Sequence, residues 1–160
     1  MLFRVRFLGT EHLPGAAAGR AAGGWICCAL PHRTWVEPLL LLALLPAEPR
    51  LIVLGDGRTI FRSPLRRLLA TRVGGVVPIW SGSGRAAFAG HVEAARRTVA
   101  AGAVFCLFPE VGPPVRMPEL RRLSPGVAYL ALRTGAPIVP VVFGGTDSLY
   151  LRRRIEVRLL

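Results

Sequence analysis

An α/β fold, with a mixed and mostly parallel sheet flanked by helices, is the architecture that the sequence predicts. Short apolar runs of strand length alternate along the chain with segments of helical periodicity. Glycine and proline separate these segments, and the sequence has no internal repeat. Because strands and helices alternate, the chain is expected to form a layered α/β domain. A length of 160 residues suits a single domain over residues 1–160 and leaves no room for a second.

The first expected elements lie in the amino-terminal quarter of the chain. Residues 3–8 alternate apolar and basic side chains, which is the period-two pattern of a half-buried strand. A loop of small residues follows at 15–24, and residues 25–30 form an apolar run of strand length. Pro38 is expected at the first position of a helix, because its missing N–H would have no partner there. Residues 39–45 form the apolar body of that helix.

The middle of the chain is expected to hold two strands and one short helix. Residues 50–54 form a strand, and Ser63 is expected to cap a helix over residues 64–69. Residues 76–80 form the next strand, and residues 81–84 form a turn.

The last half of the chain is expected to hold two helices and three strands. The first helix covers residues 85–101 and ends at Gly102, because glycine adopts the left-handed backbone that closes helices. Its apolar face is a stripe at helical spacing: Phe88, Val92, Ala95 and Val99. The second helix begins at Ser124 and Pro125 and ends at Gly135. The strands cover residues 103–108, 138–143 and 155–159.

The composition excludes a disordered chain and indicates the charge of its partners. Apolar residues make up 52% of the sequence and charged residues 19%. The formal net charge is +12, and all 21 basic residues are arginine. Arginine binds phosphate groups through paired N–H donors, so anionic partners such as phospholipid headgroups or coenzyme A are expected. A coding bias toward arginine, alanine, glycine and proline explains the same composition.

The cysteines and the apolar runs predict where the protein works. Cys27, Cys28 and Cys106 form no C-x-x-C pair and lie in apolar runs, as buried reduced thiols do. No signal peptide or amino-terminal anchor is visible, and the apolar run 39–45 is far shorter than the roughly 20 residues of a spanning helix. A cytoplasmic protein is expected, associated peripherally with the inner face of the cell membrane.

His32 and Glu37 form the most informative pair of side chains. His32 follows the apolar run 25–30, so it is expected at the carboxyl end of a strand, where sites gather in open α/β sheets. An imidazole can take up and return a proton near neutral pH. A carboxylate that accepts the other ring N–H fixes the tautomer and stabilises the imidazolium. A single histidine in a loop is more often structural than catalytic, so a catalytic interpretation of His32 and Glu37 needs support from the rest of the chain.

That support comes from five blocks in a fixed order along the chain. They are G-T-E-H-L-P at 9–14, H-R-T-W-V-E at 32–37, F-P-E at 108–110, S-P-G-V-A-Y-L-A at 124–131 and A-P-I-V-P-V at 136–141. These blocks resemble G-x-E-N-L-P, H-x4-D, F-P-E-G, K-x-G-x-x-x-L-A and A-P-I-V-P-V of the glycerolipid acyltransferase family, that is, the 1-acylglycerol-3-phosphate or PlsC-like acyltransferases. The resemblance covers nearly the whole chain.

The resemblance implies a glycerolipid acyltransferase-like fold and an O-acyltransferase activity. A fatty acyl group would move from an acyl thioester, acyl-CoA or acyl carrier protein, to the hydroxyl of a lysophospholipid or related acceptor. His32 would act as general base, supported by Glu37, and no covalent acyl-enzyme is required. The resemblance implies no cofactor, because the acyl thioester is a co-substrate.

The chain departs from the family pattern at three places. Glu37 stands where the family has aspartate, and Val111 to Pro114 replace the family's hydroxyl residue and phosphate-binding arginine. Ile79, Trp80 and Ser81 stand in place of a basic pair. These departures weaken the expected grip on an acceptor phosphate. The substrate-binding residues that we expect are Phe108, Pro109, Glu110, Arg33, Arg62, Arg85 and Arg116, of which the last three could replace the missing phosphate contacts.

Several interpretations remain beside this one. A non-catalytic relative could keep the fold and bind lipid or a partner protein. Residues 82–87 fit a dinucleotide-binding G-x-G-x-x-A, although such short turns arise often by chance. The arginine pairs at 66–67, 96–97 and 121–122 are typical of solvated helix faces and also suit an anionic membrane surface. No nucleic-acid partner and no metal are expected, because the corresponding motifs are missing. Whether the chain is a fragment or a minimal version stays open.

Overall fold

A single twisted sheet forms the centre of the computed structural model, which describes residues 3–14, 24–57, 62–65, 67–68, 75–79, 85–110, 121–150 and 152–160. In this part of the chain the sheet has seven strands in the order β1-β7-β6-β2-β5-β3-β4. The strands are β1 (Arg4–Leu8), β2 (Ile26–Leu30), β3 (Leu51–Asp56), β4 (Val76–Ile79), β5 (Val104–Leu107), β6 (Ile138–Gly144) and β7 (Arg154–Leu159). The helices are η1 (Thr10–His12), α1 (Val36–Leu44), α4 (Arg85–Ala100) and α5 (Gly126–Thr134).

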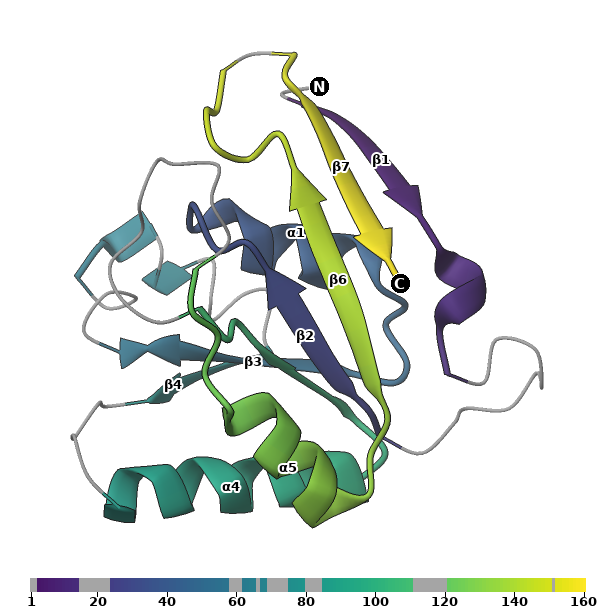
Figure 1. Cartoon of the computed structure of the whole chain (residues 1–160). Helices are drawn as coiled ribbons and strands as arrows, with labels where there is room; N and C mark the ends of the chain where they lie inside the picture. Colours follow the sequence, from purple (N-terminus) through teal and green to yellow (C-terminus); the bar gives the residue numbers. More distant parts are fainter. Residues whose placement is uncertain are drawn as a thin grey trace.

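The strands run parallel across the centre of the sheet and reverse at one side. β6, β2, β5, β3 and β4 are mutually parallel, whereas β7 lies antiparallel to β6, and β1 is parallel to β7. This mixed, mostly parallel sheet confirms the predicted fold class. The carboxyl ends of the five parallel strands therefore lie at one edge of the sheet (Figure 1).

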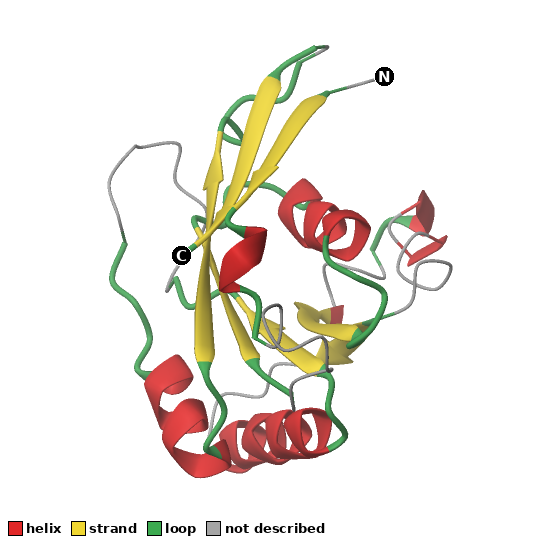
Figure 2. Cartoon of the chain, turned by 90° about the vertical axis from the view of Figure 1, so that its right-hand side faces the viewer, coloured by secondary structure: helices red, strands yellow, loops and turns green. Residues whose placement is uncertain are grey.

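Helices cover both faces of the sheet, and each face has its own apolar core (Figure 2). On one face, Leu41 and Leu45 of the α1 region pack with Trp25, Cys27 and Ala29. On the other face, α4 and α5 pack over β2 and β5, with Ile26, Phe105, Ala95, Val127 and Leu130 in contact. Alternate residues of β2 thus enter opposite cores, which explains why this strand is continuously apolar.

The connections of the chain create a switch point between β2 and β5. The connection after β2 runs through α1 on one face to β3, and the connection after β5 runs through α5 on the other face to β6. Adjacent strands whose connections leave on opposite faces open a crevice at their carboxyl ends, which is where open α/β sheets bind their ligands. His32 and the segment after β5 lie at this switch point.

The helix after His32 begins two residues earlier than expected. α1 starts at Val36, so Pro38 occupies the third helical position instead of the first. All N–H groups in a first helical turn lack a partner within the helix, so proline is tolerated at either position. The expected start at Pro38 was therefore wrong by two residues.

The other helix boundaries agree closely with the sequence. Gly102 and Gly135 have positive φ angles of 78° and 68° directly after α4 and α5. On α4, Ala95 is buried and Val92 and Val99 pack against the same core, as the predicted stripe requires. The side chain of Phe88, most of the expected loop 15–24 and the turn 81–84 lie outside the described residues. Residues 64, 65, 67 and 68 are helical, and the Arg67 N–H donates to the backbone oxygen of Ser63.

The described helices are short or polar. Among them, none is both long and apolar enough to pass through a lipid bilayer.

Candidate active site

His32 and Glu37 are in direct contact at the carboxyl end of β2. The Nδ1 atom of His32 lies 3.1 Å from Oε2 of Glu37. The histidine side chain is 43% exposed, whereas the glutamate side chain is fully buried. A carboxylate at Nδ1 keeps the proton on that nitrogen, so the lone pair of Nε2 is available to accept another proton. The pair can therefore act as an oriented general base.

The buried carboxylate of Glu37 is held by the backbone between β2 and α1. Its oxygens accept N–H groups of Arg33, at 3.1 Å, and of Thr34, at 3.0 and 2.7 Å. Glu37 is the second residue of α1, and no side chain of the N-cap residue Trp35 caps the helix. The longer glutamate reaches back over the helix start, so it holds the turn and the imidazole at once. A carboxylate at a helix amino terminus is also favoured by the helix dipole.

Glu110 reaches the histidine loop from the neighbouring strand. Its Oε2 accepts the backbone N–H of His32 at 2.7 Å, across 78 residues of sequence. Its Oε1 is buried and has no hydrogen-bond partner among the described residues. An isolated bridge between Glu110 and Leu123, and a bond from the Ser124 N–H to the Pro109 oxygen at 2.8 Å, fix the segment after β5. Glu110 therefore positions the backbone of His32, a contact that the F-P-E motif alone did not predict.

Aromatic rings form one wall of the site. The rings of His32 and Phe108 have centroids 4.3 Å apart and planes inclined by 31°. Phe143 of β6 stacks behind Phe108 at 6.4 Å. This packing limits rotation of the imidazole, so that the ring is held from two sides, by Glu37 and by Phe108. Phe143 was not identified from the sequence, because only strand pairing brings it beside residue 108.

The structure brings only some of the other predicted binding residues near His32 and Glu37. Pro109 is buried, and Arg33 contributes its backbone N–H to Glu37. Arg62 is exposed at the start of the short helical segment. Arg85 begins α4, directly after the connection from β4, and β4 lies three strands from β2, about 14 Å at the usual strand spacing. The side chain of Arg85 and the whole of Arg116 lie outside the described residues.

The cysteines are structural. Hydrogen bonding to Cys27 and burial raise the pKa of the Cys106 thiol well above its usual value. Burial, together with Cys27, also raises the pKa of the Cys28 thiol. Thiols of this kind stay protonated at neutral pH and are poor nucleophiles. His32, with its two glutamates, is the better candidate for chemistry.

A cavity lies at the opposite edge of the sheet from His32 and Glu37. It has a volume of about 670 Å³ and is lined by residues that precede β2 and β6, together with Arg96 and Arg133. It lies at the amino ends of these strands, about 16 Å from His32 along a five-residue strand. Among the described side chains, no group of three histidine, cysteine, aspartate or glutamate residues is arranged to hold a metal ion.

Comparisons with known proteins identify the family and the fold of the chain. A family model described as Acyltransferase matches residues 4–144. No curated protein matches the chain. The solved structure of the 1-acyl-sn-glycerophosphate (LPA) acyltransferase PlsC from Thermotoga maritima is similar, with a TM-score of 0.67 and 19% sequence identity. The match covers 98% of this chain and 60% of that chain, so the present chain spans somewhat more than half of that protein.

The matched region contains both His32 and Glu110, the two residues that β2 and β5 bring together. The mixed seven-stranded sheet of the described residues, with helices on both faces, is the fold of PlsC. The chain therefore belongs to the Acyltransferase family and has the fold of PlsC.

Proposed function

We propose that this chain transfers a fatty acyl group from an acyl thioester to the hydroxyl of a lysophospholipid or a related lipid. The observation that carries the proposal is the contact between Nδ1 of His32 and the buried carboxylate of Glu37. This contact leaves Nε2 as the proton acceptor on a side chain that is partly exposed. Acyl-CoA and acyl carrier protein are both suitable donors, because each presents the same thioester.

The proposed reaction proceeds in one addition and one elimination. Nε2 of His32 takes the proton of the acceptor hydroxyl while the hydroxyl oxygen attacks the thioester carbonyl carbon. The carbon–sulfur bond then breaks, and the leaving thiolate receives the proton from the imidazolium. The products are an ester and a free thiol, and His32 is regenerated. Glu37 stabilises the imidazolium between the two proton transfers.

The wild-type chain is expected to release free coenzyme A from oleoyl-CoA only when an acceptor hydroxyl is present. A thiol-reactive dye measures the release, with lysophosphatidic acid, lysophosphatidylglycerol and monoacylglycerol as acceptors. Because Val111 to Pro114 replace the phosphate-binding arginine of the family pattern, we expect a smaller preference for the phosphate headgroup than that pattern implies. Release that is independent of every acceptor would indicate a thioesterase, and no release with acyl-CoA or acyl carrier protein would favour a lipid-binding relative.

Replacement of Glu110 tests whether this residue acts through the backbone of His32. The Glu110→Ala variant removes the acceptor of the His32 N–H and is expected to lower kcat by about 10- to 100-fold, the equivalent of one unmade buried hydrogen bond. The Glu110→Gln variant keeps an oxygen at this position and should retain kcat within about threefold. Steady-state kinetics of both variants separate kcat from KM. If both variants instead raised the KM of the acceptor equally and kept kcat, Glu110 would be assigned to acceptor binding.

A further inference from the structure

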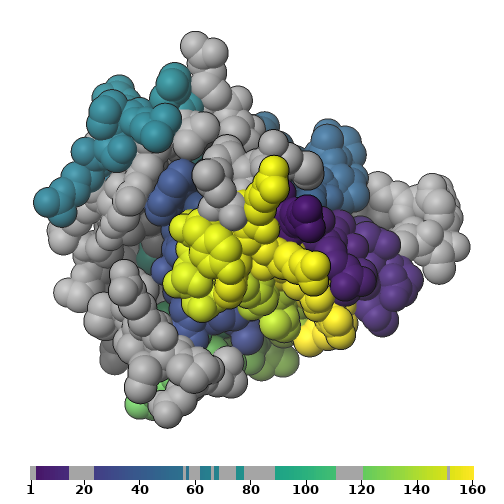
Figure 3. Space-filling model, turned by 90° about the horizontal axis from the view of Figure 1, so that it is seen from above, coloured from purple at the N-terminus to yellow at the C-terminus, as the bar shows by residue number. Residues whose placement is uncertain are grey.

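The loop between β6 and β7 lies at the same edge of the sheet as His32. β6 is parallel to β2, with Leu30 opposite Val142, so both strands end at this edge. β6 continues to Gly144, and the loop follows with residues 145–150 and 152–153. Seen from above in Figure 3, the yellow-green and yellow atoms that follow β6 lie near the middle of this face. The base of the loop therefore follows the strand next to β2, and adjacent strands lie about 4.8 Å apart.

The side chain of Arg153 holds this loop in one conformation. Its guanidinium donates to the Gly145 oxygen at 3.2 Å, to Asp147 at 3.1 Å and to the Tyr150 hydroxyl at 2.9 Å. The guanidinium carbon also lies 5.2 Å from the centre of the Tyr150 ring. Gly145 has a φ angle of 80°, and a Cβ there would collide with the backbone oxygen of Arg154. The loop is thus built to present its tip in a fixed shape.

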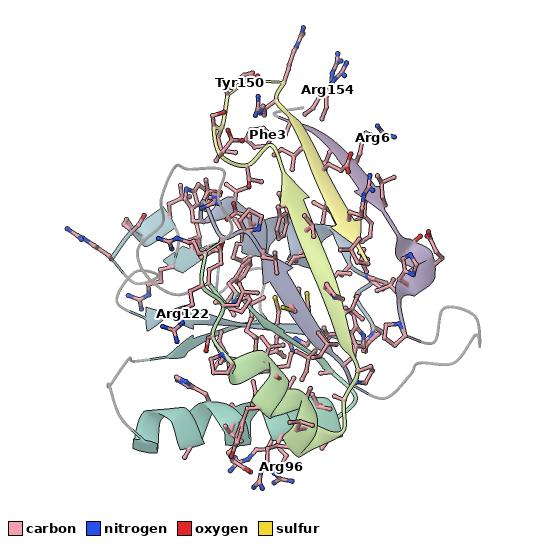
Figure 4. The ribbon with its side chains drawn as sticks, in the orientation of Figure 1. Phe3, Arg6, Arg96, Arg122, Tyr150 and Arg154 are labelled. Atoms are coloured by element: carbon pink, nitrogen blue, oxygen red, sulfur yellow. The ribbon has the colours of Figure 1, made fainter. Side chains whose placement is uncertain are left out.

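The loop exposes two apolar side chains next to Asp147, whose charge is paired with Arg153, and further arginines lie at its base. Leu149 is 37% exposed and Tyr150 is 57% exposed. Arg4, Arg152 and Arg154 are exposed beside them, and Arg4 lies opposite Arg154 in the pairing of β1 with β7. None of these three arginines has a carboxylate partner among the described residues. In Figure 4, Tyr150 and Arg154 lie together at the top of the molecule, and Arg96 lies at the opposite end.

We propose that the β6–β7 loop docks on an anionic lipid bilayer and turns the active site toward it. Apolar and aromatic side chains enter the interface between headgroups and acyl chains, while arginines around them pair with lipid phosphates. The site lies at the edge of the sheet that would face the bilayer, so a lysolipid acceptor could reach His32 without leaving the membrane surface. That advantage rests on the proposed function, whereas the docking itself does not.

Vesicle sedimentation tests the docking without any acyl transfer, so its failure is separate from failure of the proposed function. The full chain is mixed with vesicles of phosphatidylcholine with and without phosphatidylglycerol. Each arginine near an anionic surface changes the partition coefficient by about fivefold. The combined variant Arg4→Gln, Arg152→Gln and Arg154→Gln should therefore lose on the order of 100-fold in partition onto anionic vesicles. The Leu149→Ser substitution should weaken partition onto anionic vesicles by a further several-fold.

Matched control variants at the opposite edge remove the same charge and the same apolar group. Arg96→Gln, Arg97→Gln and Arg133→Gln together, and separately Leu132→Ser, which removes a side chain 86% exposed on α5, should leave partition nearly unchanged. Equal losses in the two arginine sets would show unspecific attraction and overturn the proposal. Partition that no variant changes would overturn it as well. If replacement of Arg4, Arg152 and Arg154 weakened binding to single-stranded RNA and left partition onto vesicles unchanged, the surface would be a nucleic-acid site and the proposal would be overturned.

Discussion

Replacement of His32 by glutamine should lower kcat for acyl transfer by about 10²–10⁴-fold, the usual contribution of a positioned general base. Glutamine keeps a polar side chain of similar size next to Glu37 and Phe108, but its amide cannot take a proton at neutral pH. KM for the acyl thioester should change little, because the imidazole acts on the acceptor hydroxyl. The measurement is acceptor-dependent release of free thiol under saturating donor.

Folding must be separated from chemistry in this variant. The His32 side chain is 43% exposed, so the substitution should leave the melting temperature close to that of the wild type. His12→Gln is the matched control, since His12 is also exposed and lies in η1, away from both glutamates of the site. A His32→Gln variant with wild-type kcat would refute the assignment of the base, even if the family membership stands.

Replacement of Glu37 by glutamine should reduce both activity and stability. The amide oxygen can still accept the N–H groups of Arg33 and Thr34. The amide nitrogen then stands in place of Oε2, where it faces the Thr34 N–H as a second donor and can donate to Nδ1 of His32. The imidazole would have to carry its proton on Nε2, which is the wrong tautomer for a base. We expect a loss in kcat on the order of 10³-fold. The free energy of unfolding should fall by about 1–3 kcal/mol, because buried donors lose their acceptor.

A second substitution at the same position tests the role of side-chain length. Glu37→Asp keeps the charge and matches the family pattern, but it is one methylene too short to hold the turn and Nδ1 together in this backbone. Its kcat should fall between those of the wild type and Glu37→Gln. Glu156→Gln on β7 is the control for loss of a partly buried carboxylate with an ion pair. If Glu37→Gln retained wild-type kcat and stability, orientation by the carboxylate would be excluded.

Much of the fold could be predicted, because local patterns mark where each element begins and ends. The expected strand at 25–30 and the end of α5 at Gly135 agree with the structure within one residue. The expected strand at 50–54 was two residues too short at its end. Gly55 and Asp56 are poor strand formers, and their strand conformation comes from pairing with Pro78 and Ile79 of β4. Pro38 was misplaced because any position in a first helical turn accepts proline.

Local sequence is enough to bring His32 and Glu37 into contact, since a strand that ends just before a helix begins places residues five apart side by side. Only the tertiary structure decided that β5 lies beside β2, which carries Glu110 to the backbone of His32 across 78 residues. The same is true of Phe143 behind Phe108, and of Arg4 beside Arg154. The apolar strands of this chain have similar local sequences, so local patterns allow several strand orders. The order is selected by packing on the two buried faces of the sheet, which depends on contacts far apart in the sequence.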